Sequence, residues 1–322
     1  MKENGQKKQF ENYSKINMCL YPILIKNKRY CKTKKNKGII PECPDKRLRY
    51  VTAACGKCYE CRKQKAREWQ VRMSEETRHN PNALFVTLTI TDESFNEIAK
   101  KYKLKTEEEC IKKMIRLWLE RVRKTTKKSL KHWFTTEKGG NRTERYHLHG
   151  IVWGAKDTTL ITELWKYGFV FIGSFVNEQT INYITKYITK KDLKHPNFSP
   201  TILCSAGIGE KYLSRSDSEL NRFRGKQTTE TYRLRNGTKL NLPIYYRNKI
   251  YTDEEREQLF LNKIEKGIVW ILGQKVNIAD EGTYFQLLKQ AQKDCQRLHG
   301  DDPVQWEEAK YERRLQKQRR GL

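Results

Sequence analysis

The sequence predicts an α+β fold in which helices pack against a central, mainly antiparallel sheet. Residues 83–91, ALFVTLTIT, alternate aliphatic residues with phenylalanine and threonine, which is the period of a strand with one face in a core. Residues 131–154 contain two strand patterns around a glycine-rich loop, and this arrangement predicts a hairpin. Helical patterns separate these strands. The predicted order is therefore strand, helix, hairpin, helix, strand and helix.

The other elements each have a signal of their own. Residues 55–76 predict a loop followed by a basic helix that packs along one edge. Thr106 and Glu109 have the spacing of a capping box, and the apolar stripe after them predicts a helix that covers the sheet. A short helix is predicted at 157–167, ended by a glycine, and residues 169–176 predict another strand.

Changes in composition along the chain predict five regions. These are a basic N-terminal arm at 1–50, a cysteine cluster with a basic helix at 51–80, a core at 81–195, a basic extension of the core at 196–260 and a charged helical C-terminal region at 261–322. The segment KYERRLQKQRRGL at the end is expected to be a solvated basic tail.

The balance of charge indicates a polyanionic partner. Lysine and arginine outnumber the acids 66 to 38, and the resulting net charge of +28 is far more than solubility requires. The 7 Trp and 17 Tyr suit unpaired nucleic acid, whose bases stack on aromatic rings. The sequence has no long apolar run, no signal-peptide core and no phosphate-loop motif, so we expect no membrane binding, no export, reduced thiols and no ATP-driven motor.

The segment RYHLHGIVWG places two histidines on one strand of the hairpin. His147 and His149 are two residues apart, so both imidazoles project from the same face. Neutral imidazoles in this arrangement can hold a divalent cation together with a third ligand, and hairpin pairing can bring Glu137 within reach. Such a set leaves coordination positions open, as a catalytic ion requires. The alternative is a surface histidine pair beside an unrelated acid.

The stretch INYITKYITKKD, residues 181–192, predicts a helix with two different faces. At about 100° per residue, the wheel separates Ile181, Ile184 and Ile188 from Tyr183, Tyr187, Lys186 and Lys190. The isoleucines are enough to anchor the helix, so the tyrosine hydroxyls are free to point at a site. Tyrosine is a poor nucleophile unless a cation lowers its pKa or polarises the electrophile, and this site offers lysines and a metal for both roles. The alternative is a tyrosine pair that only stacks on a partner.

The strand FVTLTIT, the pair HLH and the helix YITKYITKK, in this order, resemble the motifs of the HUH endonucleases that initiate rolling-circle replication. The two-tyrosine helix followed by lysines is similar to the microvirus branch. The segments CGKCYECRKQKAREW, LWKYGFVFIGSF and SAGIGEKYL resemble the replication initiation proteins of gokushovirus-like phages. The resemblance covers residues 50–260 and identifies the core at 81–195 as the nuclease.

This resemblance implies a set of roles. His147 and His149 would hold Mg²⁺ or Mn²⁺ with an upstream acid, which is Glu137 or, alternatively, Glu144. The two tyrosines, assisted by Lys190 or Lys186, would attack the strand in turn, keep the 5′ phosphate, release a 3′ hydroxyl and later close the displaced strand. The implied partners are single-stranded DNA, replicative-form origin DNA and a host helicase and polymerase, all in the bacterial cytoplasm.

Three cysteines before the basic helix form a second candidate site. Cys55, Cys58 and Cys61 have the pattern C-x-x-C-x-x-C, and the gokushovirus-like proteins have a similar cluster. Three thiolates could bind a structural zinc ion with Cys19, Cys31 or Cys43 as the fourth ligand. The alternative is three buried small residues at the start of a helix.

The sequence thus predicts an endonuclease and strand transferase that nicks origin DNA, forms a 5′-phosphotyrosine link and rejoins the ends. Three alternatives remain at this point. The first is a related plasmid initiator or single-strand transposase. The second is a non-enzymatic, basic DNA-binding or packaging protein. The third is a zinc hydrolase that uses water as the nucleophile and has no need of the tyrosines.

Overall fold

The computed structural model describes residues 18–301, except 35, 141–143, 156, 174, 193 and 196–197. The described chain divides into two compact units. The sheet unit comprises Ala66–Glu219 and Thr231–Tyr246, and the cysteine unit comprises the described residues up to Lys65, Leu220–Glu230 and the described residues from Arg247 onward. The predicted basic tail at 310–322 and the beginning of the predicted N-terminal arm lie outside the described residues.

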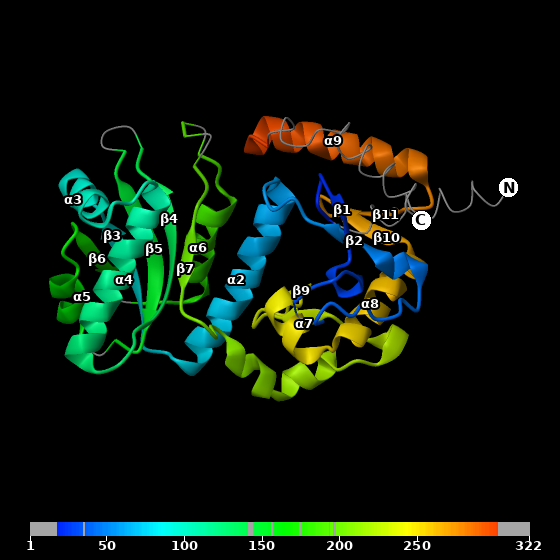
Figure 1. The fold of residues 1–322 in the computed structure, drawn as a ribbon, viewed down its shortest axis with the longest axis horizontal. Coiled ribbons are helices and arrows are strands. Elements are labelled where there is room, and N and C mark those ends of the chain that lie inside the picture. Colours follow the sequence, from blue (N-terminus) through cyan, green and yellow to red (C-terminus); the bar gives the residue numbers. More distant parts are fainter. Residues whose placement is uncertain are drawn as a thin grey trace. The chain divides into compact units, whose positions relative to one another are not determined.

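A five-stranded sheet forms the centre of the sheet unit, with the strands in the order β6-β3-β5-β4-β7 (Figure 1). Its strands are β3 at Ala83–Thr89, β4 at Lys131–Lys138, β5 at Tyr146–Trp153, β6 at Val170–Gly173 and β7 at Ile202–Cys204. All neighbouring strands are antiparallel, which confirms the predicted fold class. The sequence does not predict β7, because three residues are too few to show a strand period.

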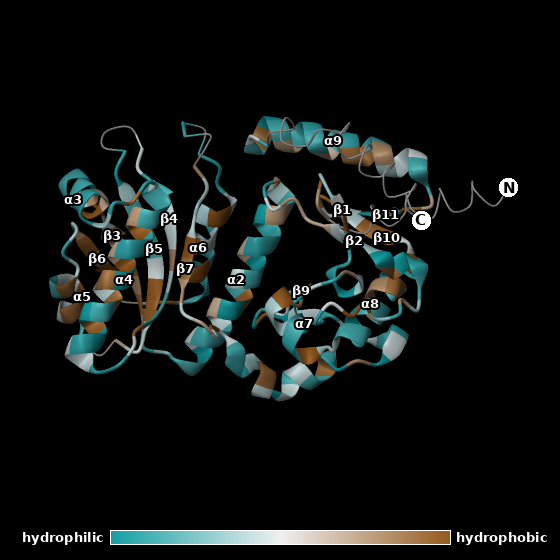
Figure 2. Ribbon diagram, viewed as in Figure 1, coloured by the Kyte–Doolittle hydropathy of each residue, from teal (hydrophilic) through white to brown (hydrophobic). Residues whose placement is uncertain are grey.

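Helices cover both faces of this sheet. The helices are α2 at Tyr59–His79, α3 at Asp92–Tyr102, α4 at Glu107–Thr126, α5 at Thr158–Leu164 and α6 at Glu178–Thr189. Helices α3, α4 and α5 contribute to the core on the face that carries Leu88 and Leu148. The part of α2 from Ala66 onward and α6 pack on the other face, against Trp133 and Ile151. Figure 2 shows mostly hydrophobic residues along the central strands and mixed residues along the helices.

Helix α4 begins and packs as the sequence predicts. The Thr106 hydroxyl accepts a hydrogen bond from the Glu109 amide at 3.2 Å, and the Glu109 carboxylate accepts one from the Thr106 amide at 3.1 Å. Its apolar stripe is buried, with Met114 and Trp118 at 0% exposure. Both the capping box and the stripe are confirmed.

Two other helices differ from prediction at their ends. Helix α5 stops at Leu164 and does not reach 167, because Trp165 turns to extended backbone and its indole donates to the Thr89 carbonyl at 3.1 Å. Helix α6 begins at Glu178, earlier than the predicted 181, because the Asn177 side chain accepts from the Thr180 amide and caps it. A sequence pattern of apolar residues does not record either of these polar contacts.

The cysteine unit contains two small sheets and two helices. Strand β1 at Ile23–Lys26 pairs with β2 at Tyr50–Ala53, β10 at Ile268–Ile271 pairs with β11 at Gln274–Asn277, α8 spans Asp253–Lys266 and α9 spans Glu281–His299. The hairpin of β10 and β11 lies in a region that the sequence predicts as helical. Two-residue turns such as Leu272–Gly273, both with positive φ, favour hairpins, and the charged residues around it conceal this signal.

Short elements complete the described chain. They are β8 at Thr231–Arg233, β9 at Lys239–Asn241, α7 at Ile244–Ile250 and 3-10 helices at Lys28–Tyr30, Lys46–Arg49, Glu210–Ser214, Ser216–Asn221 and Gly225–Gln227. Within the described residues, no helix combines the length and the apolarity needed to span a bilayer.

Gly150 tests how tightly the central strands pack. A Cβ at this position would lie 2.2 Å from the Trp133 carbonyl oxygen and 2.3 Å from the Phe134 ring, whereas a Cβ at Gly140 would meet nothing within 4 Å. We expect Gly150→Ala to lower the free energy of unfolding by about 1–3 kcal/mol, because the buried ring and backbone must move. Gly140→Ala should stay within about 0.5 kcal/mol of the wild type. Chemical denaturation followed by circular dichroism measures both, and equal stabilities would contradict the close approach.

Candidate active site and cysteine cluster

The two histidines of β5 lie on the face of the sheet that α6 covers, and each has a threonine partner. In the strand register Thr87 is opposite His149 and Thr89 is opposite His147. The Thr87 hydroxyl lies 3.1 Å from Nδ1 of His149, and the Thr89 hydroxyl lies 3.2 Å from Nδ1 of His147. These contacts orient both rings through Nδ1, so Nε2 of each ring is the atom presented for a ligand. The sequence analysis does not identify the threonines as site residues, although their alternation places them on this face.

Glu137 lies opposite His147 in the hairpin register but bonds to His149. Its Oε2 is 3.1 Å from Nε2 of His149, and its Oε1 accepts from the Lys190 ammonium at 3.0 Å. Burial raises the pKa of the Glu137 carboxyl group, but the hydrogen bonds from His149 and Lys190 outweigh burial and lower it overall. Glu137 is therefore an ionised carboxylate held between a lysine and a histidine. Glu144, the alternative acid, lies elsewhere, with Oε1 3.6 Å from Nε2 of His195.

The donor set fits a divalent cation in part. Adjacent ligands of an octahedral ion at about 2.1 Å are roughly 3.0 Å apart, and the 3.1 Å between the Glu137 and His149 donor atoms matches this spacing. Burial and the neighbouring His149 lower the pKa of His147, which keeps its ring neutral, as a ligand must be. Its ring centroid is 6.3 Å from that of His149. Among the described residues only the cysteine cluster brings three or more donors within 4.8 Å of one another, so the structure does not draw His147 fully into this set.

Gly139 keeps the space beside His147 open. A Cβ at Gly139 would lie 3.3 Å from Nε2 of His147 and 3.0 Å from the Arg145 carbonyl oxygen. The glycine-rich loop of the hairpin therefore does more than permit a turn, because it leaves Nε2 of His147 uncovered by a side chain. The sequence indicates the loop but not this contact.

The tyrosine pair of α6 meets the histidines from above the sheet. The hydroxyl oxygens of Tyr183 and Tyr187 are 2.7 Å apart. The Tyr187 ring stacks on the His149 ring, with centroids 4.3 Å apart and an angle of 6° between the ring planes. Tyr183 is 48% exposed and meets Phe85 edge to face at 6.2 Å. Burial, the hydrogen bond with Tyr183 and the charge of Glu137 raise the pKa of Tyr187.

The predicted isoleucine face of α6 is confirmed, and the two lysines separate in position. Ile181, Ile184 and Ile188 have exposures of 1%, 0% and 4%. Lys190 follows the last residue of α6 and reaches Glu137. Lys186 is exposed on the helix, and the salt bridge to Glu137 is made by Lys190 instead. The structure thus brings Tyr183, Tyr187, Lys190, Glu137 and His149 together, with His147 beside them.

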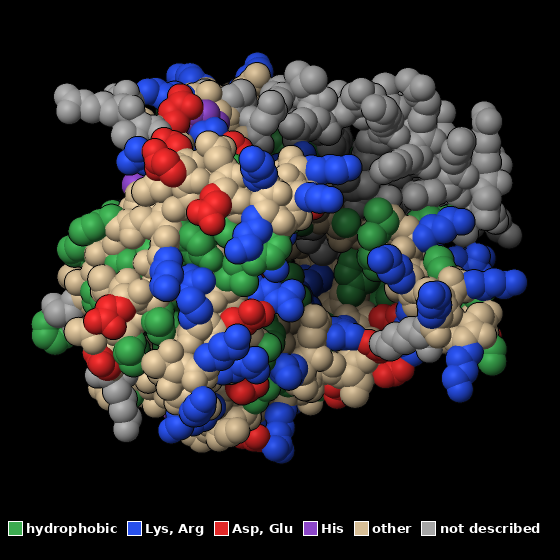
Figure 3. Space-filling model, turned by 60° about the vertical axis from the view of Figure 1, so that its left-hand side comes forward, with side chains coloured by type: hydrophobic (Ala, Val, Ile, Leu, Met, Phe, Trp, Pro, Cys, Tyr) green, Lys and Arg blue, Asp and Glu red, His purple; other side chains and the backbone are tan. Residues whose placement is uncertain are grey.

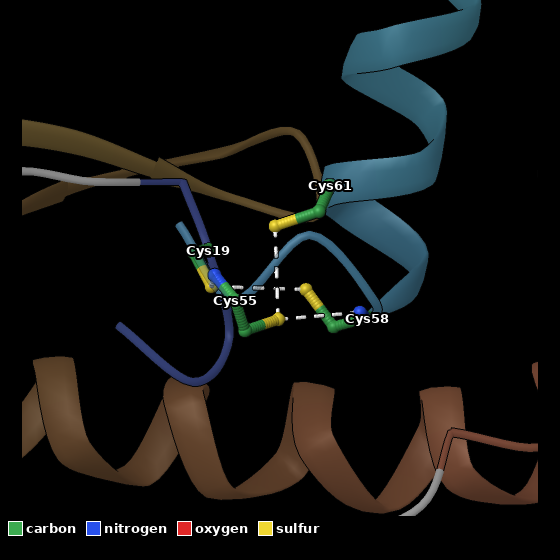
Figure 4. A group of neighbouring side chains, drawn as sticks. All are labelled: Cys19, Cys55, Cys58 and Cys61. Carbon is green, nitrogen blue, oxygen red and sulfur yellow. Dashed lines mark hydrogen bonds between the residues drawn. The ribbon is translucent and has the colours of Figure 1, made fainter. Parts of the chain in front are cut away.

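Four cysteines of the cysteine unit converge on one point, and Cys19 is the fourth member (Figure 4). Their sulfur atoms all lie within 4.8 Å of one another, with 3.9 Å between Cys19 and Cys58 and 3.8 Å between Cys55 and Cys61. A zinc ion with Zn–S bonds of about 2.3 Å places tetrahedral sulfurs roughly 3.8 Å apart. The thiols are free and not paired in disulfides. This cluster could hold a metal such as zinc.

The surroundings of the cluster suit thiolate ligands. Backbone amides of Tyr21 and Cys55 donate to the Cys19 sulfur at 3.3 and 3.2 Å, and the Cys58 amide donates to the Cys55 sulfur at 3.3 Å. Hydrogen bonds from the Cys19 thiol and its neighbours lower the pKa of Cys55. The cluster lies in the apolar core that also contains residues of the β10–β11 hairpin and α9. A metal there would join the N-terminal segment to the start of α2. Cys31 and Cys43, the other candidates for the fourth ligand, bond to backbone carbonyl oxygens elsewhere.

Comparisons with known proteins single out the same part of the chain. A family model of replication-associated proteins of the ORF2 type matches residues 83–192, which run from β3 to just beyond α6 and include all proposed catalytic residues. The replication-associated protein ORF2 of Spiroplasma virus 4 is 26% identical over 246 residues, which are 68% of this chain and 68% of that protein. No solved structure matches the chain. Over the segment that carries the site, the chain is therefore similar to viral replication-associated proteins.

Proposed function

We propose that this protein is a viral rolling-circle replication initiator that nicks unpaired origin DNA by attack of a tyrosine hydroxyl. One observation carries the proposal, namely the pair of tyrosine hydroxyls 2.7 Å apart, packed on a histidine that is bonded to an ionised glutamate. A site built only to bind DNA has no need of this combination. The similarity to the Spiroplasma virus protein and the net charge of +28 support the same conclusion.

The chain's own residues divide the work of the reaction. Glu137, His149 and His147 would hold Mg²⁺ or Mn²⁺, which supplies polarisation of the scissile phosphodiester. Attack forms a bond between the tyrosine oxygen and phosphorus and breaks the bond from phosphorus to the 3′ oxygen. The phenol loses a proton and the 3′ oxygen gains one, so the products are a 5′-phosphotyrosine and a free 3′ hydroxyl. Lys190 offsets charge on the phosphate or on the phenolate.

The second tyrosine explains how the displaced strand is closed. After one round of synthesis, the free hydroxyl of the pair attacks the regenerated origin, and the released 3′ hydroxyl then attacks the first phosphotyrosine. Each step exchanges one phosphodiester for another, so no external energy is needed. Unwinding and synthesis would come from a host helicase and polymerase. All proposed catalytic residues lie within 81–195, where we place the nuclease.

Tyrosine replacement tests the proposal directly. With unpaired origin DNA and Mn²⁺, we expect a covalent protein–DNA adduct on a denaturing gel for the wild type and for Tyr183→Phe and Tyr187→Phe singly. The double variant should form none, because no phenol remains at the site. Tyr102→Phe is the matched control, since Tyr102 is a partly exposed tyrosine on α3, on the other face of the sheet, and should behave as wild type.

Two outcomes of this assay would reject the proposal. DNA binding without any adduct in the wild type would favour a basic DNA-binding or packaging protein. Cleavage that persists in the double variant would favour a hydrolase in which water is the nucleophile. Removal of divalent ions with EDTA should abolish adduct formation and leave most of the DNA binding, because phosphate contacts supply most of the affinity.

The two lysines of α6 form a matched pair for a second test. Lys190→Ala removes the ammonium group that lies 3.0 Å from Glu137, whereas Lys186→Ala removes an exposed ammonium from the same helix. We expect Lys190→Ala to slow adduct formation roughly 100-fold, in line with the loss of one preorganised charged donor. Lys186→Ala should keep the wild-type rate within a few-fold. Single-turnover kinetics at saturating protein measures both, and equal losses in the two variants would contradict a specific role for Lys190.

We also propose that Cys19, Cys55, Cys58 and Cys61 bind a structural zinc ion. Metal analysis of protein purified under reducing conditions should give one zinc per chain, and chelation should lower the melting temperature, because the ion stabilises only the folded state. Cys19→Ser should lose the zinc, whereas Cys31→Ser, which changes a thiol outside the cluster, should retain it. Full zinc content in Cys19→Ser would reject Cys19 as a ligand.

A further inference from the structure

We propose that Phe171 on β6 and Phe169 just before it form a stacking platform for the bases of an unpaired DNA strand beside the tyrosine pair. The inference rests on the proposed nicking function and adds the surface that holds the strand next to the cut. It assigns a binding role to two side chains that no motif identifies.

The strand register aligns these phenylalanines with the histidines. Phe171 pairs with Thr87, and Thr87 pairs with His149. The Phe169 carbonyl accepts from the Thr89 amide at 2.8 Å, and Thr89 pairs with His147. Each phenylalanine therefore lies in a cross-strand row with a threonine and a histidine. Neighbouring strands are about 4.8 Å apart, so each ring is two strands, roughly 10 Å, from its histidine.

A continuous series of aromatic contacts joins β6 to the candidate site. The Phe171 and Phe85 ring centroids are 6.3 Å apart, and those of Phe85 and Tyr183 are 6.2 Å apart. Tyr183 meets Tyr187 at 5.5 Å, and Tyr187 stacks on His149 at 4.3 Å. A phosphodiester at the tyrosine hydroxyls would have its neighbouring nucleotides on the adjoining surface, and on this side the adjoining surface is aromatic.

The exposure of these rings needs an explanation. Phe169 is 70% exposed and Phe171 is 51% exposed, on an edge strand of the sheet. Edge strands usually carry charged residues that prevent association, and exposed apolar patches usually mark binding sites. Figure 3 shows hydrophobic side chains among many Lys and Arg side chains on one face of the molecule. Aromatic rings within a strongly basic chain match an unpaired nucleic acid, which offers stacking faces and phosphates together.

The test separates contacts with bases from contacts with phosphates. Fluorescence anisotropy measures the affinity for labelled oligodeoxythymidine and for an abasic strand of equal length. We expect Phe169→Ala and Phe171→Ala each to weaken thymidine binding about fivefold or more, and to leave abasic binding unchanged. Phe171→Tyr should retain the wild-type affinity, since its ring still stacks. Phe285→Ala is the matched control, because Phe285 is 47% exposed on α9 of the other unit.

Each result supports or overturns the platform. Equal losses on both strands, or no loss on either, would overturn it. Unchanged affinity together with a shift from dimer to monomer in sedimentation would make this surface an interface between copies. If the wild type forms no tyrosine adduct but the base-dependent losses occur, the nicking function fails and the platform stands. Melting curves of the variants should match the wild type, because both rings are exposed.

Discussion

The antiparallel register of β3, β5 and β4 fixes the position of every polar group of the candidate site on the sheet. Because side chains alternate between the two faces, Leu88 and Leu148 enter the core while Thr89 and His147 lie on the opposite face. A shift of one residue in either strand pair would exchange these faces. The large apolar core under α4 thus protects the register, and the register in turn aligns threonine, histidine and glutamate without any contribution from loops.

The polar groups on this face form a chain of linked contacts. Lys190 neutralises Glu137, Glu137 holds His149, and Thr87 fixes the other nitrogen of the same ring. The negative charge of Glu137 also contributes to the raised pKa of Tyr187, so the tyrosine stays protonated in this arrangement. A divalent cation between Glu137 and the histidines would offset that charge and remove part of the cause. The same carboxylate can therefore keep the proposed nucleophile inactive without an ion and permit its activation with one.

Sequence reasoning recovers the elements of this site better than its contacts. The two-residue period predicts the strands, and the wheel predicts the buried face of α6 because those isoleucines form a separate apolar stripe. The hairpin pairing places Glu137 near the histidines, but only the side-chain conformation decides that it bonds to His149 and not to His147, its neighbour in the register. The fourth cysteine is similar. Spacing along the chain cannot rank Cys19, Cys31 and Cys43, because the path of the N-terminal segment depends on distant packing against β10 and β11.

The spacing of the tyrosines sets what the pair can do. Residues four apart on a helix lie one above the other, so two long side chains can bring their ends to one point. Here the hydroxyls meet at 2.7 Å although only Tyr187 stacks on His149. Either oxygen can thus approach the same phosphorus after a small movement, but the two rings are held differently, one by the histidine and one by Phe85. Shared position with unequal support is the arrangement that alternating nucleophiles require, because one must stay linked to DNA while the other attacks.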